Sequence, residues 1–345
     1  MKKYVFDKVE LPVSKDPIYF AYHFEATGAS LVIKNPSIRN WYLNNVMQLC
    51  CNRRFIGGYT TPFVYINNSS YWYNPHLERI CIPIRFLGNS IHEVIHRFLL
   101  DGFYVAFEGA DDYYIDGKSW HKERHFIHDG LICGYDDIEK TYSIRAYDKS
   151  WLYRTFKTPQ NSFGKACKVA LKTVNYSRIC GVRVLQDNVE INEKQILNGL
   201  IEYLDSDFEK YPPYVPETAF GIVVHDYVAI YLYKQLSGAF PYEKIDKRIF
   251  CAIWEHKRAM LERIVAVENK LCLGNAVSSQ YAKVVKDAET MRMLYASHVL
   301  KRRDSILIKL KEGVISLKEK ERHLLGMFIE DMKGKMSYET VDKNI

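Results

Sequence analysis

The chain has 345 residues, of which 48% are hydrophobic, 14% aromatic and 26% charged, with a net charge of +7. This balance is typical of a globular protein and excludes a chain that is mainly disordered. The apolar runs are too short for a membrane-spanning helix, and the basic start lacks the apolar core of a secretory signal, so we expect a soluble, cytoplasmic protein. The mild charge, without a basic arm or a zinc-finger pattern, argues against nucleic-acid binding.

The first half mixes predicted helices with predicted strands. Helices are expected at 20–33, 38–50 and 90–101, and strands at 78–86, 104–108, 129–135 and 141–147. A polar stretch of hairpin length, 136–140, joins the last two strands. Because the elements do not alternate as a regular βαβ series, the pattern favours an α+β fold over a doubly wound sheet.

The second half is predicted to be helical. Apolar residues recur at helical spacing in four segments, at 191–209, 215–238, 244–273 and 275–333. We therefore expect a first domain over 1–165 and a mainly helical domain over 166–345. The tract beyond Lys301 is amphipathic, which is typical of a structural helix or of a helix that forms a homodimer.

The eight cysteines form no CxxC pair and fit no zinc-site spacing. Most of them stand in apolar strings, as Cys81 and Cys133 do. We therefore expect buried free thiols of a reducing compartment, with no metal ion and no cofactor.

One stretch points to chemistry. His128 opens a predicted strand that ends in Gly134-Tyr135-Asp136, and the next predicted strand closes with Asp148. On paired antiparallel strands these two ends come together, so the carboxylate of Asp148 is expected to orient the imidazole of His128 as a general base. His125, three residues earlier, is the weaker candidate.

This pattern resembles the papain-like fold of bacterial double-glycine leader peptidases. It is more similar to the papain-like acyltransferases of natural-product biosynthesis, of which the butirosin acyltransferase is the type. The resemblance covers roughly 12–148. It implies a helix packed with an antiparallel sheet, a cysteine–histidine–aspartate mechanism, and an amide bond formed from an acyl group on a carrier-protein thioester. It also implies an acyl or peptidyl carrier protein as donor and a small-molecule amine as acceptor.

Carried onto this chain, the resemblance makes His128 the catalytic histidine and Asp148 its partner, but it places the nucleophile at Ala21. Three explanations stay open: a cysteine-to-alanine substitution, a scaffold that lost its nucleophile, or Cys50 or Cys51 acting instead. The last is chemically poor, because these thiols are expected to close a helix, and a helix C-terminus raises a thiol pKa.

The resemblance also suggests substrate-binding residues. Tyr22 adjoins the nucleophile position, and Asp112 and Tyr113 fall on a segment that borders the cleft in the family. Three basic residues of the late helical tract are expected to meet an acidic carrier protein: Lys301, Arg302 and Arg303. The leading hypothesis is an acyltransferase, and the alternatives are a peptidase of the same fold and a non-catalytic binding protein.

Overall fold

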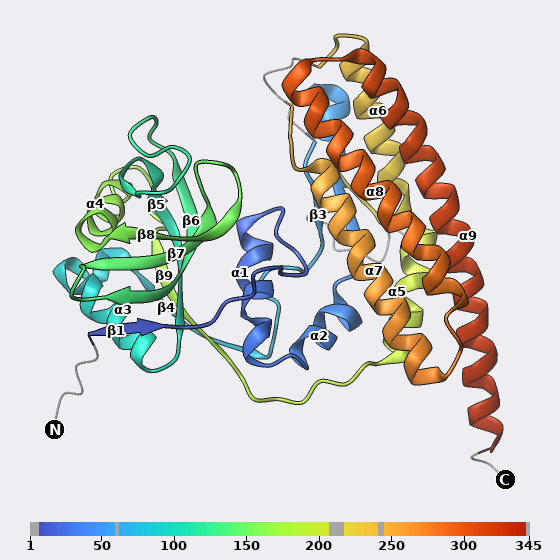
Figure 1. Ribbon diagram of the computed structural model, residues 1–345, viewed down its shortest axis with the longest axis horizontal. Helices are drawn as coiled ribbons and strands as arrows, with labels where there is room; N and C mark the ends of the chain where they lie inside the picture. Colours follow the sequence, from blue (N-terminus) through green and yellow to red (C-terminus); the bar gives the residue numbers. More distant parts are fainter. Residues whose placement is uncertain (1–6, 59–61, 207–216, 241–244, 343–345) are drawn as a thin grey trace. The chain divides into compact units, whose positions relative to one another are not determined.

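A computed structural model describes residues 7–58, 62–206, 217–240 and 245–342. The chain divides into two units (Figure 1). The first comprises Met1–Ile38 and Ser70–Asn188, and the second comprises Arg39–Ser69 and Val189–Ile345. This division corrects the expected boundary at residue 165, because the segment after it still belongs to the first unit and an early segment belongs to the second.

The first unit is α+β, as predicted, and contains an antiparallel sheet. Its strand order is β4-β9-β5-β6-β7-β8, and β1 also pairs with β6. The four predicted strands are confirmed as β4, Leu77–Pro83; β5, Tyr104–Asp111; β6, Ile127–Asp136; and β7, Thr141–Tyr147. Three further strands were not predicted: β1, Lys8–Glu10; β8, Tyr153–Pro159; and β9, Arg178–Val184.

Three helices accompany this sheet: α1, His23–Leu31; α3, Ile91–Leu100; and α4, Gln160–Ala170. Ile91, Ile95 and Phe98 recur at helical spacing, so α3 buries one apolar face. Together with α4 it shares a core with the strand residues Phe107 and Ile144. In α1 almost every residue is buried, and the expected helix at 20–33 begins only at residue 23.

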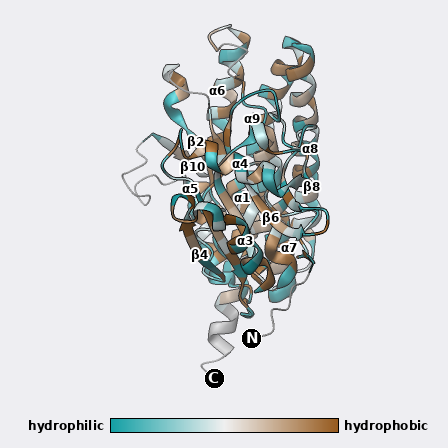
Figure 2. Ribbon diagram, turned by 90° about the vertical axis from the view of Figure 1, so that its left-hand side faces the viewer, coloured by the Kyte–Doolittle hydropathy of each residue, from teal (hydrophilic) through white to brown (hydrophobic). Residues whose placement is uncertain are grey.

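The second unit is mainly helical. Its helices are α2, Ile38–Asn45; α5, Glu193–Asp205; α6, Val224–Leu236; α7, Ile249–Leu271; α8, Ala276–Lys301; and α9, Asp304–Asp342. Their ribbons change between hydrophilic and hydrophobic colours along their length, as amphipathic helices do (Figure 2). The expected helix ends at 209, 215 and 244 lie outside the described residues.

Three expectations for this unit were wrong. One is the helix expected at 215–238, because Thr218–Phe220 is a strand and the α-helix begins only at Val224. The predicted helix at 38–50 ends at Asn45, and Cys50 and Cys51 lie instead in strand β2, Leu49–Asn52. That strand pairs with β3, Val64–Ile66, and with β10, Thr218–Phe220, so pairing partners distant in the sequence override the local pattern. The predicted helix at 275–333 is two helices, because Arg302 adopts a left-handed conformation that closes α8.

The cysteines depart in part from the expected free thiols. Cys81 and Cys180 lie directly opposite each other on β4 and β9 and form a disulfide. Four other cysteines are buried free thiols, whereas Cys251 is half-buried and Cys272 is exposed. Among the helices in the described part of the chain, none has the length and apolar character to cross a membrane.

Candidate active site

His128 stands at the start of β6, beside a buried carboxylate. Its Nδ1 lies 3.4 Å from Oδ2 of Asp112, which is 2% exposed, while the side chain of His128 itself is 33% exposed. A carboxylate at Nδ1 favours the tautomer that carries its proton there, which leaves Nε2 able to accept a proton. This is the arrangement of an oriented general base.

The pairing of β5 with β6, and the turn that follows β5, place Asp112 next to His128. Ala110 pairs with His128 across β5 and β6, so the residues just after Ala110 arrive at the start of β6. The side chain of Asp111 accepts hydrogen bonds from the backbone N–H groups of Tyr113 and Phe126, and the N–H of Asp112 donates to the carbonyl of Phe126 at 2.9 Å. These bonds begin a 3₁₀ turn, Asp112–Tyr114, and hold it against β6.

A buried cation balances the charge of Asp112. The Nζ of Lys118 lies 3.2 Å from Oδ1 of Asp112 and donates to the backbone carbonyl of Asp129 at 2.7 Å, and Lys118 is 1% exposed. An unpaired carboxylate at this depth would be strongly destabilising, so Lys118 allows Asp112 to be buried beside the imidazole.

A bulge in β5 places a second carboxylate near the histidine. The β5–β6 register shifts between Phe107 and Ala110, where Gly109 has a φ of +83°. The N–H of Gly109 donates to Oδ1 of Asp129 at 3.3 Å. Burial raises the pKa of the Asp129 carboxyl, an effect that the electrostatic interaction with His128 opposes.

A second histidine, which the sequence reasoning did not single out, contacts the first. His23 is the first residue of α1, and its ring lies edge-on to that of His128 with centroids 4.3 Å apart. The N–H of Tyr147 donates to Nε2 of His23 at 3.2 Å, so this nitrogen is an acceptor and His23 carries its proton on Nδ1. Because Nε2 of His23 already accepts this hydrogen bond, His128 is the better placed of the two histidines to accept a proton.

The expected pairing of Asp148 with His128 was wrong. Oδ1 of Asp148 accepts the N–H groups of Ser150 at 2.8 Å and Leu152 at 3.0 Å, and its Oδ2 pairs with Arg154. These bonds cap the turn that follows β7. The carboxylate beside His128 is therefore Asp112, which the sequence suggested only as a cleft residue.

The other expected site residues surround the start of α1 and the 3₁₀ turn. Ala21 is 1% exposed and lies two residues before the first residue of α1, outside the helix in which it was expected. Tyr22 is the N-cap residue of α1 and is buried, with its ring stacked on Phe24. Tyr113 stacks on the exposed His125. Nδ1 of His125 lies 2.7 Å from Oδ2 of Asp111, whereas Asp112 is the carboxylate beside His128.

The cysteines of the first unit do not supply a reactive thiolate. Cys81 and Cys180 are joined in the disulfide. Burial raises the pKa of the Cys133 thiol to about 12 and raises that of Cys167 as well. In the second unit burial also raises the pKa of Cys51 to about 12, so the proposal of a nucleophile there gains no support.

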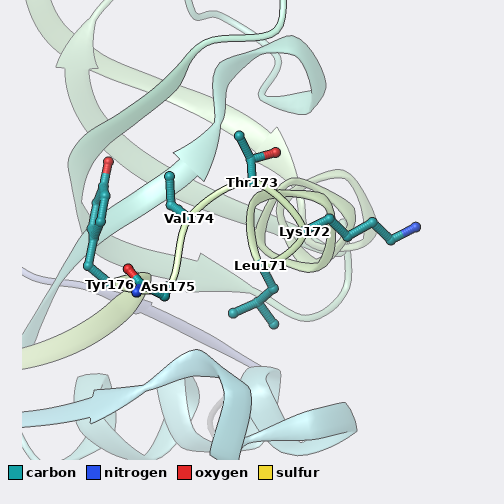
Figure 3. A pocket seen from close by; sticks show the side chains of 6 residues that line it. All are labelled: Leu171, Lys172, Thr173, Val174, Asn175 and Tyr176. Atoms are coloured by element: carbon teal, nitrogen blue, oxygen red, sulfur yellow. The ribbon is translucent and has the colours of Figure 1, made fainter.

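Two surface hollows lie apart from these residues. One, of about 430 Å³, is lined by the six consecutive residues after α4, from Leu171 to Tyr176 (Figure 3). The other, of about 420 Å³, lies between the starts of α3 and α4 and includes His92, Lys165 and Lys168. Neither hollow is lined by His128, Asp112 or His23.

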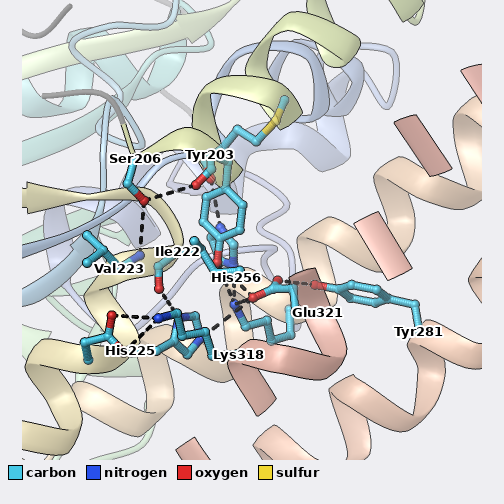
Figure 4. Close-up of polar contacts among 12 residues, drawn as sticks. Tyr203, Ser206, Ile222, Val223, His225, His256, Tyr281, Lys318 and Glu321 are labelled. Carbon is cyan, nitrogen blue, oxygen red and sulfur yellow. Dashed lines mark hydrogen bonds and ion pairs between the residues drawn. The ribbon is translucent and has the colours of Figure 1, made fainter. Parts of the chain in front are cut away.

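The helical unit encloses its own group of titratable residues. Oε2 of Glu321 on α9 lies 2.6 Å from Nζ of Lys257 on α7, and the same carboxylate accepts hydrogen bonds from Tyr203 on α5 and Tyr281 on α8 (Figure 4). Nε2 of His225 on α6 lies 3.7 Å from it. The group thus joins five helices. Its side chains are fully buried, so it is closed to substrate.

Comparison with known proteins found no match: no family model fits the chain, and no curated protein is significantly similar to it.

The sequence therefore indicated His128 and missed two of its neighbours. His23 falls within the helix expected at 20–33, and Lys118 lies between two predicted strands, where it was not singled out. A histidine near the start of an expected helix is a signal for His23, but nothing in the sequence distinguishes Lys118 from the nearby Lys122 and Arg124.

Proposed function

We propose that the first unit is a papain-like fold that transfers an acyl group directly from a thioester to an amine, with His128 as the general base. The observation that carries the proposal is the pairing of a half-exposed His128, at the start of β6, with the buried Asp112. His23, at the start of α1, contacts the ring of His128. The resemblance of the sequence to papain-like acyltransferases suggests the thioester donor, on a carrier protein, and the amine acceptor.

Direct transfer needs no cysteine. The nitrogen of a neutral amine attacks the thioester carbonyl and forms the C–N bond, while its proton passes to Nε2 of His128. The C–S bond then breaks, and the leaving thiolate takes that proton. A thioester is activated toward an amine, so a positioned base and a bound substrate supply the needed acceleration, typically about 10²–10⁴-fold for the base alone.

A peptidase of the same fold is the less favoured alternative. An amide has a poor leaving group, and papain-like peptidases meet this difficulty with a thiolate nucleophile. The residue at the expected nucleophile position is Ala21, and α1 contains no cysteine. Ala21 also favours the other alternative, a non-catalytic binding protein. A measurement of turnover distinguishes that protein from an acyltransferase.

The test is amine-dependent thiol release from an acyl-N-acetylcysteamine thioester, with several amines supplied in parallel. We expect the wild-type chain to release thiol faster with amine than without, and His128→Ala to lose at least about 10²-fold of that rate. The matched control is His125→Ala, which removes another histidine paired with an aspartate, but an exposed one. Equal rates in the two variants would contradict the proposal, and no turnover by the wild type would favour the binding protein.

A further inference from the structure

An aromatic surface leads away from His128 along two turns of the first unit. The ring of Phe126 lies 5.0 Å from that of His128, Trp120 lies 6.3 Å from Phe126, and Trp151 lies 5.8 Å from Trp120. Trp151 and its neighbour Leu152 are 57% and 56% exposed. Large apolar side chains exposed together next to a polar site are typical of ligand contact.

This surface is built rather than incidental. Asp148 caps the turn that presents Trp151 and Leu152, and its backbone carbonyl accepts the hydroxyl of Ser119 at 2.6 Å. Lys118 also forms a β-bridge with Asp148, so the turn that carries Trp120 is fastened to the turn that carries Trp151.

The backbone at the tip of the surface is unusual. Trp151 has a φ of +59°, a left-handed conformation that bulky residues seldom adopt. The surrounding bonds hold Trp151 in this conformation, and residues kept in such conformations cluster at ligand-binding sites. The strain thus supports a functional role for the exposed indole.

We infer that the surface formed by Phe126, Trp120, Trp151 and Leu152 binds the acyl group of the substrate, and that this acyl group is aromatic. The inference rests on the proposed function, because it assigns the acyl group of that reaction. Phe126 links this surface to the proposed base, because its ring lies 5.0 Å from that of His128.

Two features favour an aromatic acyl group over an aliphatic chain. Aromatic side chains give a ring ligand stacked and edge-to-face contacts that an alkyl chain cannot make. The surface is also open, with Trp151 and Leu152 more than half exposed, so a long flexible chain would lose conformational freedom there without being enclosed, whereas a rigid ring loses little.

Arg124 adds a planar cation to the three aromatic rings. Its guanidinium lies 5.4 Å from the ring centroid of Trp120 and 5.8 Å from that of Phe126. A guanidinium held over aromatic rings can also attract the electron-rich face of a ring ligand.

The experiment is a calorimetric titration, without amine, of the whole protein with S-benzoyl-, S-acetyl- and S-octanoyl-N-acetylcysteamine. We expect the benzoyl probe to bind at least tenfold more tightly than either of the others. Trp120→Ala and Trp151→Ala should each weaken benzoyl binding at least fivefold, and Trp120→Phe should restore most of it. Tyr73→Ala, which removes another exposed aromatic ring from the same unit, is the matched control and should change nothing.

Equal affinities for the three probes, or benzoyl binding unchanged in both tryptophan variants, would overturn the inference. The Phe variant guards against a folding defect, because it preserves the aromatic ring. His128→Ala separates the two proposals: it should lose turnover while keeping benzoyl affinity within about twofold. Tryptophan-dependent benzoyl binding without any turnover would reject the proposed function and leave the surface as an aryl-binding site.

Discussion

At the scale of single residues, the aspartate beside His128 is not the one that the sequence suggested. Asp148 stands where a base-orienting carboxylate was expected, yet its oxygens cap a turn and pair with Arg154. Asp112 lies at the end of a neighbouring strand, and its carboxylate reaches His128. Spacing along the sequence identifies the strand ends that meet, but it does not tell which of several carboxylates at those ends faces the imidazole.

The two aspartates should therefore differ in kinetic effect. We expect Asp112→Asn to lower kcat by at least about 10²-fold with little change in KM, because it removes the charge that orients the base in the transition state. Asp148→Ala should mainly raise KM for an aryl thioester, because it loosens the turn that presents Trp151. Steady-state kinetics of both variants give the split, and a fall in kcat for Asp148→Ala alone would restore the expected pairing.

At the scale of elements, the strands that flank the site were predictable because they are short apolar segments, and the polar stretch 136–140 joins two of them at hairpin length. Both β6 and β7 are found within two residues of the expected ends. β9 was missed because it lies beyond the change from strands to helices expected near residue 160; a glycine alone does not hide a strand, since β6 contains Gly130 and Gly134. An added Cβ at Gly181 would lie 2.6 Å from the ring of Phe98, so this glycine is explained by helix packing rather than by a break in the strand.

The turn that carries Lys118 contains a glycine at a position where any side chain would be unfavourable. Gly117 has a φ of +92°, and an added Cβ would lie 2.3 Å from the ring of Phe156. We expect Gly117→Ala to lower the free energy of unfolding by about 2–3 kcal/mol, through backbone strain and a steric clash together.

The matched control for that turn is Gly88→Ala. Gly88 also has a positive φ, of +51°, but nothing lies within 4 Å of an added Cβ. Its substitution should cost only about 1 kcal/mol. Urea unfolding of both variants provides the comparison, and equal losses would show that the contact with Phe156 is not the cause.

At the scale of the whole molecule, composition along the chain follows secondary structure but not the division into units. The change from strands to helices near residue 160 suggested a boundary there. The chain instead leaves the first unit at residue 38, returns to it at residue 70 and leaves again at residue 188. β9 inserts between β4 and β5 in the sheet, an arrangement that only long-range pairing can reveal.

The buried group that joins five helices should make the second unit sensitive to acid. Burial, and then Lys257, lowers the pKa of His225 from 6.5 to about 4. The unfolded chain therefore takes up a proton first as the pH falls below 6.5, and the folded state loses up to about 3 kcal/mol between pH 6.5 and 4.

Glu321 acts in the same direction at lower pH. Burial by itself raises its pKa, but Lys257 and the nearby histidines lower it from 4.5 to about 2. The stability that this carboxylate contributes is present above pH 4.5 and is lost as the pH falls toward 2. Urea unfolding followed by helical circular dichroism from pH 7 to 4 should show the decline, and His225→Leu should reduce its slope. A stability independent of pH over this range, or an unchanged slope in the variant, would contradict this account of the network.

The central claim is that acyl transfer at His128 proceeds directly, without an acyl-enzyme. The most direct measurement is intact-protein mass spectrometry during a single turnover, with the protein in excess over a benzoyl thioester and an amine that supports thiol release. If the transfer is direct, the amide forms while the mass of the chain stays unchanged throughout. A transient increase in mass by one benzoyl group, which decays as the amide forms, would contradict direct transfer.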